Sequence, residues 1–80
     1  MSEVLEEIRR IAAADLDYSG AITPQLELVR DLQLDSMGMM TLAVGLEDKF
    51  RVRLNEADAA TLVTVADVMA LVEQRVKESA

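Results

Sequence analysis

The chain has 80 residues, of which 51% are hydrophobic and 29% are charged, and its 15 acidic and 8 basic residues give a net charge of −7. This length allows a single domain over residues 1–80, and the apolar fraction is too high for a disordered chain. Without Cys or His the chain lacks a thiolate nucleophile, disulfides and the commonest general base, so we do not expect an enzyme. Few Gly, Pro and aromatic residues favour an all-α fold with an aliphatic core.

The charge pattern indicates the kind of partner. A sequence pI near 4.3 disfavours nucleic acid and anionic lipid, and it favours proteins that present Lys and Arg. The N-terminal residues are acidic where a secretory signal is basic, and the longest uncharged run, residues 37–46, is half a membrane span. We therefore expect a cytoplasmic monomer that does not insert into membranes.

The first half of the chain predicts one helix and a long connection. The helix covers residues 3–14, with Ser2 as its N-cap, and its apolar residues recur at helical spacing: Val4, Leu5, Ile8, Ile11 and Ala12. Residues 15–35 have no settled period and contain Gly20 and Pro24. They predict a partly packed connection, and connections of this length are often functional.

The second half predicts three more helices. A helix over residues 36–50 is followed by an extended stretch, residues 51–54, and by a short helix with Asn55 as its N-cap that runs to about Leu62. The last helix opens at Thr64, where Thr64 and Asp67 fit a capping box. Its apolar stripe consists of Val65, Val68, Met69, Val72 and Val76.

The helix over residues 36–50 is unusual because its apolar residues fall on two opposite faces at about 100° per residue. One face has the width of an ordinary core stripe: Met39, Leu42, Ala43, Leu46 and Phe50. The apolar residues of the other face are Met37, Met40 and Val44. They share this face with Thr41 and with two acidic residues, Glu47 and Asp48. Either both faces are buried between neighbouring helices, or the second is a wet docking surface. The acids favour the docking surface, where Met side chains adapt to several partners.

The start of this helix carries a hydroxyl group. Ser36 fits an N-cap, and Asp35 can cap the helix instead. The free backbone N–H groups and the helix dipole at this position also favour a phosphate group.

Residues 31–37, Asp-Leu-Gln-Leu-Asp-Ser-Met, resemble the acyl carrier protein signature D-L-G-x-D-S-L, whose Ser carries 4′-phosphopantetheine. Three further segments resemble the family in the right order. They are Ile22-Thr23-Pro24, which stands where carriers often have a similar tripeptide, Leu46-Glu47-Asp48-Lys49-Phe50, similar to L-E-x-x-F, and Thr64-Val65-Ala66-Asp67, similar to T-V-x-D. Together the four segments cover nearly the whole chain.

The resemblance implies a small four-helix bundle with three longer helices, a short third helix and a long loop between the first two. It implies that Ser36, next to Asp35, carries 4′-phosphopantetheine, transferred from coenzyme A by a phosphopantetheinyl transferase with Mg²⁺. The cofactor then supplies the thiol that the chain lacks. It also implies that acyl-loading, condensing and tailoring enzymes with basic patches bind one surface, formed by Met37, Met40, Val44, Glu47 and Asp48.

Three departures from the pattern bear on the pathway. Gln33 replaces the usual Gly, and Gly38 and Thr41 stand where housekeeping carriers commonly have Asp and Glu. The thinner acidic face favours a specialised fatty-acid or polyketide-like pathway. An aminoacyl or peptidyl carrier is the alternative, against which Leu34 argues because such carriers usually have Gly-Gly before the modified Ser.

A calcium-binding loop is a hypothesis from another class. Residues 15–22 fit the first eight places of an EF-hand loop, with Asp15, Asp17 and Ser19 as oxygen ligands and Gly20 at the sixth place. The twelfth place is Leu26 where a bidentate Glu is required. A plain turn is therefore the favoured interpretation.

Gly38 and Gly45 lie seven residues apart, on one line of the helix between its two faces. Gly inside a helix costs up to about 1 kcal/mol relative to Ala, so the pair indicates a close approach. The two predicted neighbours are the short helix after Asn55 and the acyl chain.

Overall fold

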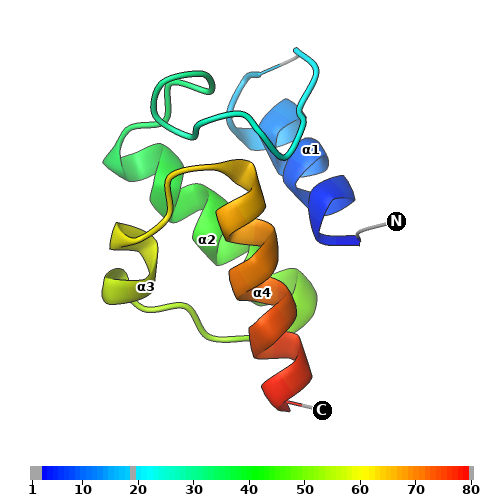
Figure 1. Ribbon diagram of the computed structural model, residues 1–80. Coiled ribbons are helices and arrows are strands. Elements are labelled where there is room, and N and C mark those ends of the chain that lie inside the picture. The colour runs from blue at the N-terminus through cyan, green and yellow to red at the C-terminus, as the bar shows by residue number, and fades with distance from the viewer. Residues whose placement is uncertain (1–2, 19, 80) are drawn as a thin grey trace.

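The computed structural model describes residues 3–18 and 20–79 and contains four helices in that part of the chain. They are α1 (Glu3–Asp15), α2 (Ser36–Phe50), α3 (Glu56–Ala60) and α4 (Val65–Ser79) (Figure 1). Apart from one isolated antiparallel bridge between Glu27 and Thr64, the described residues form no β-structure. The predicted all-α fold is confirmed. Ser2, the predicted N-cap of α1, lies outside the described residues.

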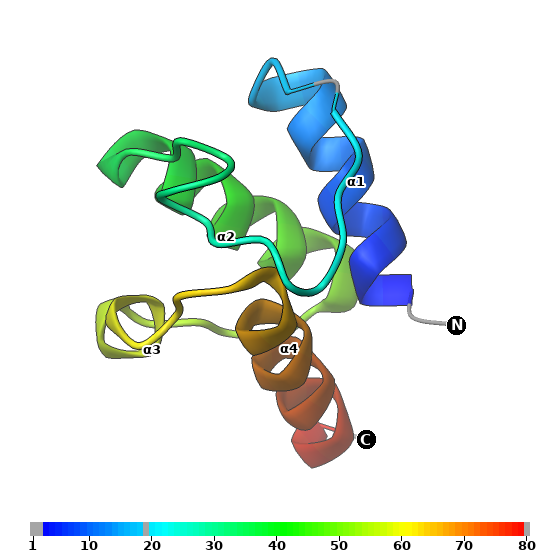
Figure 2. The same cartoon turned by 45° about the horizontal axis from the view of Figure 1, so that its top comes forward.

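The core is aliphatic, as the composition predicts. Helices α1, α2 and α4 contact one another around it, and α3 lies on the side away from α1 (Figures 1 and 2). The buried hydrophobic residues are Val4, Ile8, Ile11, Ala12, Ile22, Leu28, Leu32, Leu34, Leu42, Leu46, Val52, Val65, Val68 and Val72. Each Leu, Ile or Val removed from water in this way stabilises the fold by about 1.5–3 kcal/mol. None of the helices that the structure describes is long and apolar enough to cross a bilayer.

The connection between α1 and α2 is partly packed, as the sequence predicts. Ile22, Leu28, Leu32 and Leu34 are buried. The Leu28 backbone N–H donates to the Val63 carbonyl at 2.8 Å, which ties the connection to the segment that leads into α4. The connection therefore directs the chain into α2 as a fixed part of the core.

Side-chain caps set the ends of the two later helices. Thr64 and Asp67 form the predicted capping box of α4: the Asp67 N–H donates to Thr64 Oγ1 at 3.2 Å, and the Thr64 N–H donates to Asp67 Oδ2 at 3.0 Å. Hydrogen bonds from the backbone N–H groups of Thr64 and Val63 lower the pKa of Asp67. α3 has the predicted N-cap, Asn55, in a capping box with Asp58.

The predicted end of α3 is wrong. α3 ends at Ala60 and not near Leu62, because the Thr61 N–H and hydroxyl both donate to the Asp58 carbonyl and close a turn there. Val76 belongs to the apolar stripe of α4, but 37% of it is exposed. Val76 lies in the last turn of α4, which extends beyond the other helices (Figure 1).

Gly45 lies against α1. A Cβ atom at this position would stand 2.6 Å from Ile11 Cδ1 and 3.2 Å from Ile11 Cγ1, and Ile11 is fully buried. The predicted neighbours, the short third helix and the acyl chain, are therefore wrong for Gly45. A Cβ at Gly38 would meet Asp35 and Leu34, both at the start of its own helix. The two Gly residues thus serve two different contacts.

Gly45→Ala is expected to destabilise the protein by about 1 kcal/mol. Overpacking costs about 1–3 kcal/mol, and the better helix propensity of Ala returns up to about 1 kcal/mol. The measurement is urea unfolding in a double-mutant cycle with Ile11→Val, which removes the methyl group that the new Cβ would strike. The cost of Gly45→Ala should be smaller in the Ile11→Val background. An equal cost in both backgrounds would contradict the contact.

Candidate functional site

The start of α2 is capped by Asp35, and the alternative, Ser36 as the N-cap, is wrong. Asp35 has extended backbone angles, and its Oδ1 accepts a hydrogen bond from the Gly38 N–H at 2.7 Å. Asp35 is the N-cap because its carboxylate reaches the backbone N–H of the third helical residue, Gly38. Ser36 already occupies the first helical position and cannot cap the helix. The preceding Leu34 is buried, which fixes the chain where it enters the helix.

Ser36 is consequently unused by the fold. Its side chain is exposed and makes no hydrogen bond within the described part of the chain. The backbone N–H groups of Ser36 and Met37 also keep no acceptor among those residues. A phosphate ester on the exposed Ser36 hydroxyl would lie beside these two free N–H groups and the positive end of the helix dipole. Both favour a negatively charged group at this position.

The second apolar stripe of α2 is wet, so the alternative that both faces are buried is wrong. Met37 is 78% exposed, Met40 62% and Val44 52%. Asp48 is exposed farther along the helix. We call Met37, Met40 and Val44 the exposed ridge.

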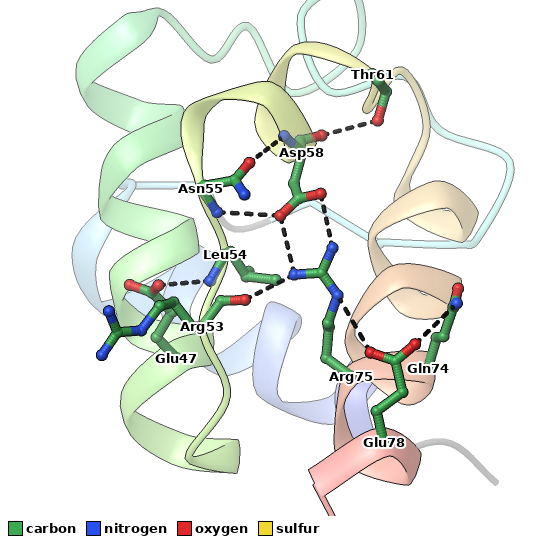
Figure 3. Close-up of polar contacts among 9 residues, drawn as sticks. All are labelled: Glu47, Arg53, Leu54, Asn55, Asp58, Thr61, Gln74, Arg75 and Glu78. Atoms are coloured by element: carbon green, nitrogen blue, oxygen red, sulfur yellow. Dashed lines mark hydrogen bonds and ion pairs between the residues drawn. The ribbon is translucent and has the colours of Figure 1, made fainter.

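Glu47 differs from the other residues predicted for this surface. It is partly buried, and its Oε2 accepts a hydrogen bond from the Leu54 N–H at 2.7 Å (Figure 3). The carboxylate thus holds the connection between α2 and α3 against α2. Of the two predicted acids, only Asp48 is left as an exposed charge.

A groove of about 380 Å³ separates α2 from α3 and the connection before it. Its lining is mostly apolar and consists of Ser36, Met39, Met40, Ala43, Val44, Glu47, Leu54, Asn55, Glu56 and Ala59. Ser36 and Glu47 mark its two ends on α2, about 16 Å apart along the helix. We call this hollow the α2–α3 groove.

A second hollow of about 370 Å³ lies on the other side of the exposed ridge. It is lined by Asp15, Met37, Met40, Thr41, Val44 and Gly45. The exposed ridge therefore lies between two hollows, so this face of α2 is not flat.

Arg75 and Asp58 form an ion pair that sequence reasoning missed. Arg75 Nη2 lies 2.8 Å from Asp58 Oδ1, and Nη1 lies 2.9 Å from Oδ2 (Figure 3). The guanidinium lowers the pKa of Asp58. No local pattern reveals this pair, because the two residues lie on different helices, 17 positions apart.

The calcium hypothesis gains no support from the geometry. Within residues 3–18 and 20–79 no group of three or more acidic side chains is placed to hold a metal ion. Ser19, the predicted fifth-place ligand, lies outside the described residues. Glu27, one residue after the required place, pairs with Arg30 at 3.4 Å.

Comparison with protein families matches residues 6–72 to the phosphopantetheine attachment site family. The match includes the connection, all of α2 and α3, and the first half of α4.

Individual proteins agree with this match. The meromycolate extension acyl carrier protein of Mycolicibacterium aurum is 34% identical over 79 residues, which cover 99% of this chain and 75% of that protein. The acyl carrier protein of Helicobacter pylori strain J99 is 34% identical over 71 residues, or 88% of this chain and 91% of that protein. The crystal structure of an acyl carrier protein from Thermotoga maritima superposes with a TM-score of 0.88 over 98% of this chain and 92% of that chain; at 18% identity it shows the fold alone.

Proposed function

The chain belongs to the acyl carrier protein family, whose members carry acyl groups on 4′-phosphopantetheine, and we propose that Ser36 is the residue that bears this group here. When bound, the group supplies the thiol on which the acyl chain is held as a thioester. The proposal is carried by one observation. Asp35 caps α2, and the exposed Ser36 hydroxyl therefore has no hydrogen-bond partner among the described residues.

The residues around Ser36 fit the attached phosphate. The attachment, made by a phosphopantetheinyl transferase, joins Ser36 Oγ to the phosphorus of the arm while the diphosphate bond of coenzyme A breaks. It releases adenosine 3′,5′-bisphosphate and the hydroxyl proton. The unpaired N–H groups of Ser36 and Met37 are donors for the phosphate oxygens. Asp35 keeps its carboxylate turned to the Gly38 N–H, at 2.7 Å, so this negative charge is engaged in capping.

The α2–α3 groove shelters the acyl chain. It begins at Ser36, its walls are mostly apolar, and burying an alkyl chain there returns about 0.8 kcal/mol for each methylene group. Met39 and Met40 line it with flexible side chains that adapt to different chains. Sheltering also keeps water from the thioester.

The exposed ridge with Asp48 is the surface that the acyl-loading, condensing and tailoring enzymes bind. Its Met side chains suit several partners, and the net charge of −7 attracts enzymes with basic patches. These enzymes carry the catalytic groups, and the chain acts as their substrate.

The pathway is a specialised fatty-acid pathway. Relatives named meromycolate extension acyl carrier protein support this assignment, as do Gly38 and Thr41 at positions where the housekeeping pattern has acids. The polyketide-like and peptidyl alternatives have no comparable support.

Ser36→Ala is expected to abolish modification and leave the protein folded. Incubation with coenzyme A, Mg²⁺ and a broad-specificity transferase should add one phosphopantetheine to the wild type, measured as intact mass, and none to the variant. Because Asp35 caps the helix, Ser36→Ala should change the free energy of unfolding by less than about 0.5 kcal/mol, whereas Asp35→Ala should cost about 1 kcal/mol.

The control for this experiment replaces the other three Ser residues, Ser2, Ser19 and Ser79, with Ala and should gain the same mass. Modification of the Ser36→Ala protein, or none on the wild type, would overturn the assignment.

Val44→Glu is expected to weaken the binding of a condensing enzyme, because the carboxylate replaces an apolar contact of the ridge and has to lose its water on binding. The melting curve should change little, because Val44 is half exposed. Asp48→Lys should slow association and flatten its salt dependence. Association and dissociation rates by surface plasmon resonance at several salt concentrations provide the measurement. Glu47→Lys is the contrasting variant and should lower stability as well, since it removes the acceptor of the Leu54 N–H. Unfolding of Val44→Glu would place the ridge in the core and refute the docking surface.

A further inference from the structure

Helix α3 forms one wall of the α2–α3 groove, but it buries no apolar side chain in the core. It has five residues, and none of them is buried. A helix of this length is unstable by itself, because nucleation costs more than one turn of hydrogen bonds returns. Its position depends on contacts that reach it from other elements.

Arg75 of α4 supplies the main polar contact. Its guanidinium binds both oxygens of Asp58 in α3, at 2.8 and 2.9 Å, and its Nη1 also donates to the Arg53 carbonyl at 2.8 Å (Figure 3). Only 29% of the Arg75 side chain and 16% of the Asp58 side chain are exposed. A bidentate pair of this kind fixes geometry as well as distance. One side chain therefore ties both α3 and the connection before it to α4.

Two further contacts complete the arrangement. The Asp58 N–H donates to Asn55 Oδ1 at 2.8 Å, and Asp58 Oδ2 accepts from the Asn55 N–H at 3.1 Å. Glu47 accepts from the Leu54 N–H at 2.7 Å on the α2 side. The Asp58 carboxylate thus serves Arg75 and its own N-cap together, and the hydrogen bonds from Arg75 and the Asn55 N–H lower the pKa of Asp58.

We propose that Arg75 is a positioning residue that sets the place of α3 against α2 and thereby selects the length of acyl chain that the groove shelters. The proposal rests on the assignment of the α2–α3 groove to the acyl chain. Arg75, Asp58 and Arg53 do not line the groove, whereas Leu54 and Ala59 beside them do. Arg75 therefore acts through the wall and not by touching the chain.

The selection follows from the size of the groove. With the Arg75 contacts made, the groove has about 380 Å³, which a short chain enters without moving α3. A long chain has to push α3 outward and break the contacts with Asp58. Short chains are favoured while Arg75 is present, and its removal shifts the preference toward long chains.

The test compares Arg75→Gln with a matched control, Arg9→Gln. Arg9 makes contacts of the same kind, to Glu6 Oε2 at 2.6 Å and to the Ile22 carbonyl at 3.0 Å, but it lies on α1 and does not line the groove. Arg75→Lys keeps the charge without the bidentate geometry. Asp58→Asn keeps a capping oxygen for Asn55 and serves if Arg75→Gln fails to fold by circular dichroism.

The first measurement is amide hydrogen exchange of residues 56–62 in the protein without its cofactor. Exchange should rise about fivefold in Arg75→Gln and less in Arg75→Lys, with no change in α1. Arg9→Gln should leave residues 56–62 unchanged. This measurement does not depend on modification or cargo.

The second measurement is the hydrolysis rate of hexanoyl and hexadecanoyl thioesters on the loaded proteins. Relative to the wild type, Arg75→Gln should hydrolyse the hexanoyl form faster and the hexadecanoyl form more slowly. A general loss of stability would speed both, so the opposite signs identify positioning.

The outcomes separate the two proposals. If both thioesters on the wild type hydrolyse as fast as free acyl-pantetheine, the groove does not shelter cargo, and the proposed function of the groove falls together with the role of Arg75. If the wild type protects its cargo but Arg75→Gln changes neither exchange nor the ratio of the two rates, only the role of Arg75 is refuted. A parallel increase of both rates in Arg75→Gln also refutes it.

Discussion

Burial of one face of α2 against α1 and α4 is the interaction on which the rest of the structure depends. Leu42 and Leu46 are 2% and 0% exposed, so this face is removed from water and holds the helix in place. The opposite face gains nothing from the core. It is left to form the exposed ridge and one wall of the α2–α3 groove.

Sequence alone predicts the features that depend on local periodicity. The two faces of α2 follow from a period of 3.6 residues, and the capping box at Thr64 follows from residues three apart. The choice between Asp35 and Ser36 does not follow, since both residue types cap helices and the outcome depends on where the connection enters α2. Sequence does not identify which elements meet in space. Gly45 indicates a close approach but not that Ile11 is the neighbour, and no local pattern pairs Arg75 with Asp58.

The start of α2 divides two tasks between neighbouring residues. Asp35 satisfies the helix, which leaves Ser36 available for chemistry. A chain without Cys or His needs no reactive group of its own if it presents one that is attached. What the fold contributes is placement: a fixed helix, an apolar groove that begins at Ser36, the proposed attachment point, and an exposed ridge beside the groove.

Isotope-filtered NOE spectroscopy on the protein loaded with a ¹³C-labelled octanoyl group shows whether the groove beginning at Ser36 receives the acyl chain. We expect contacts from the labelled methylene groups to Ala43 and Ala59, which line opposite walls of the α2–α3 groove. Contacts to Thr41 on the other side of the ridge, or an acyl chain without protein contacts, would contradict it.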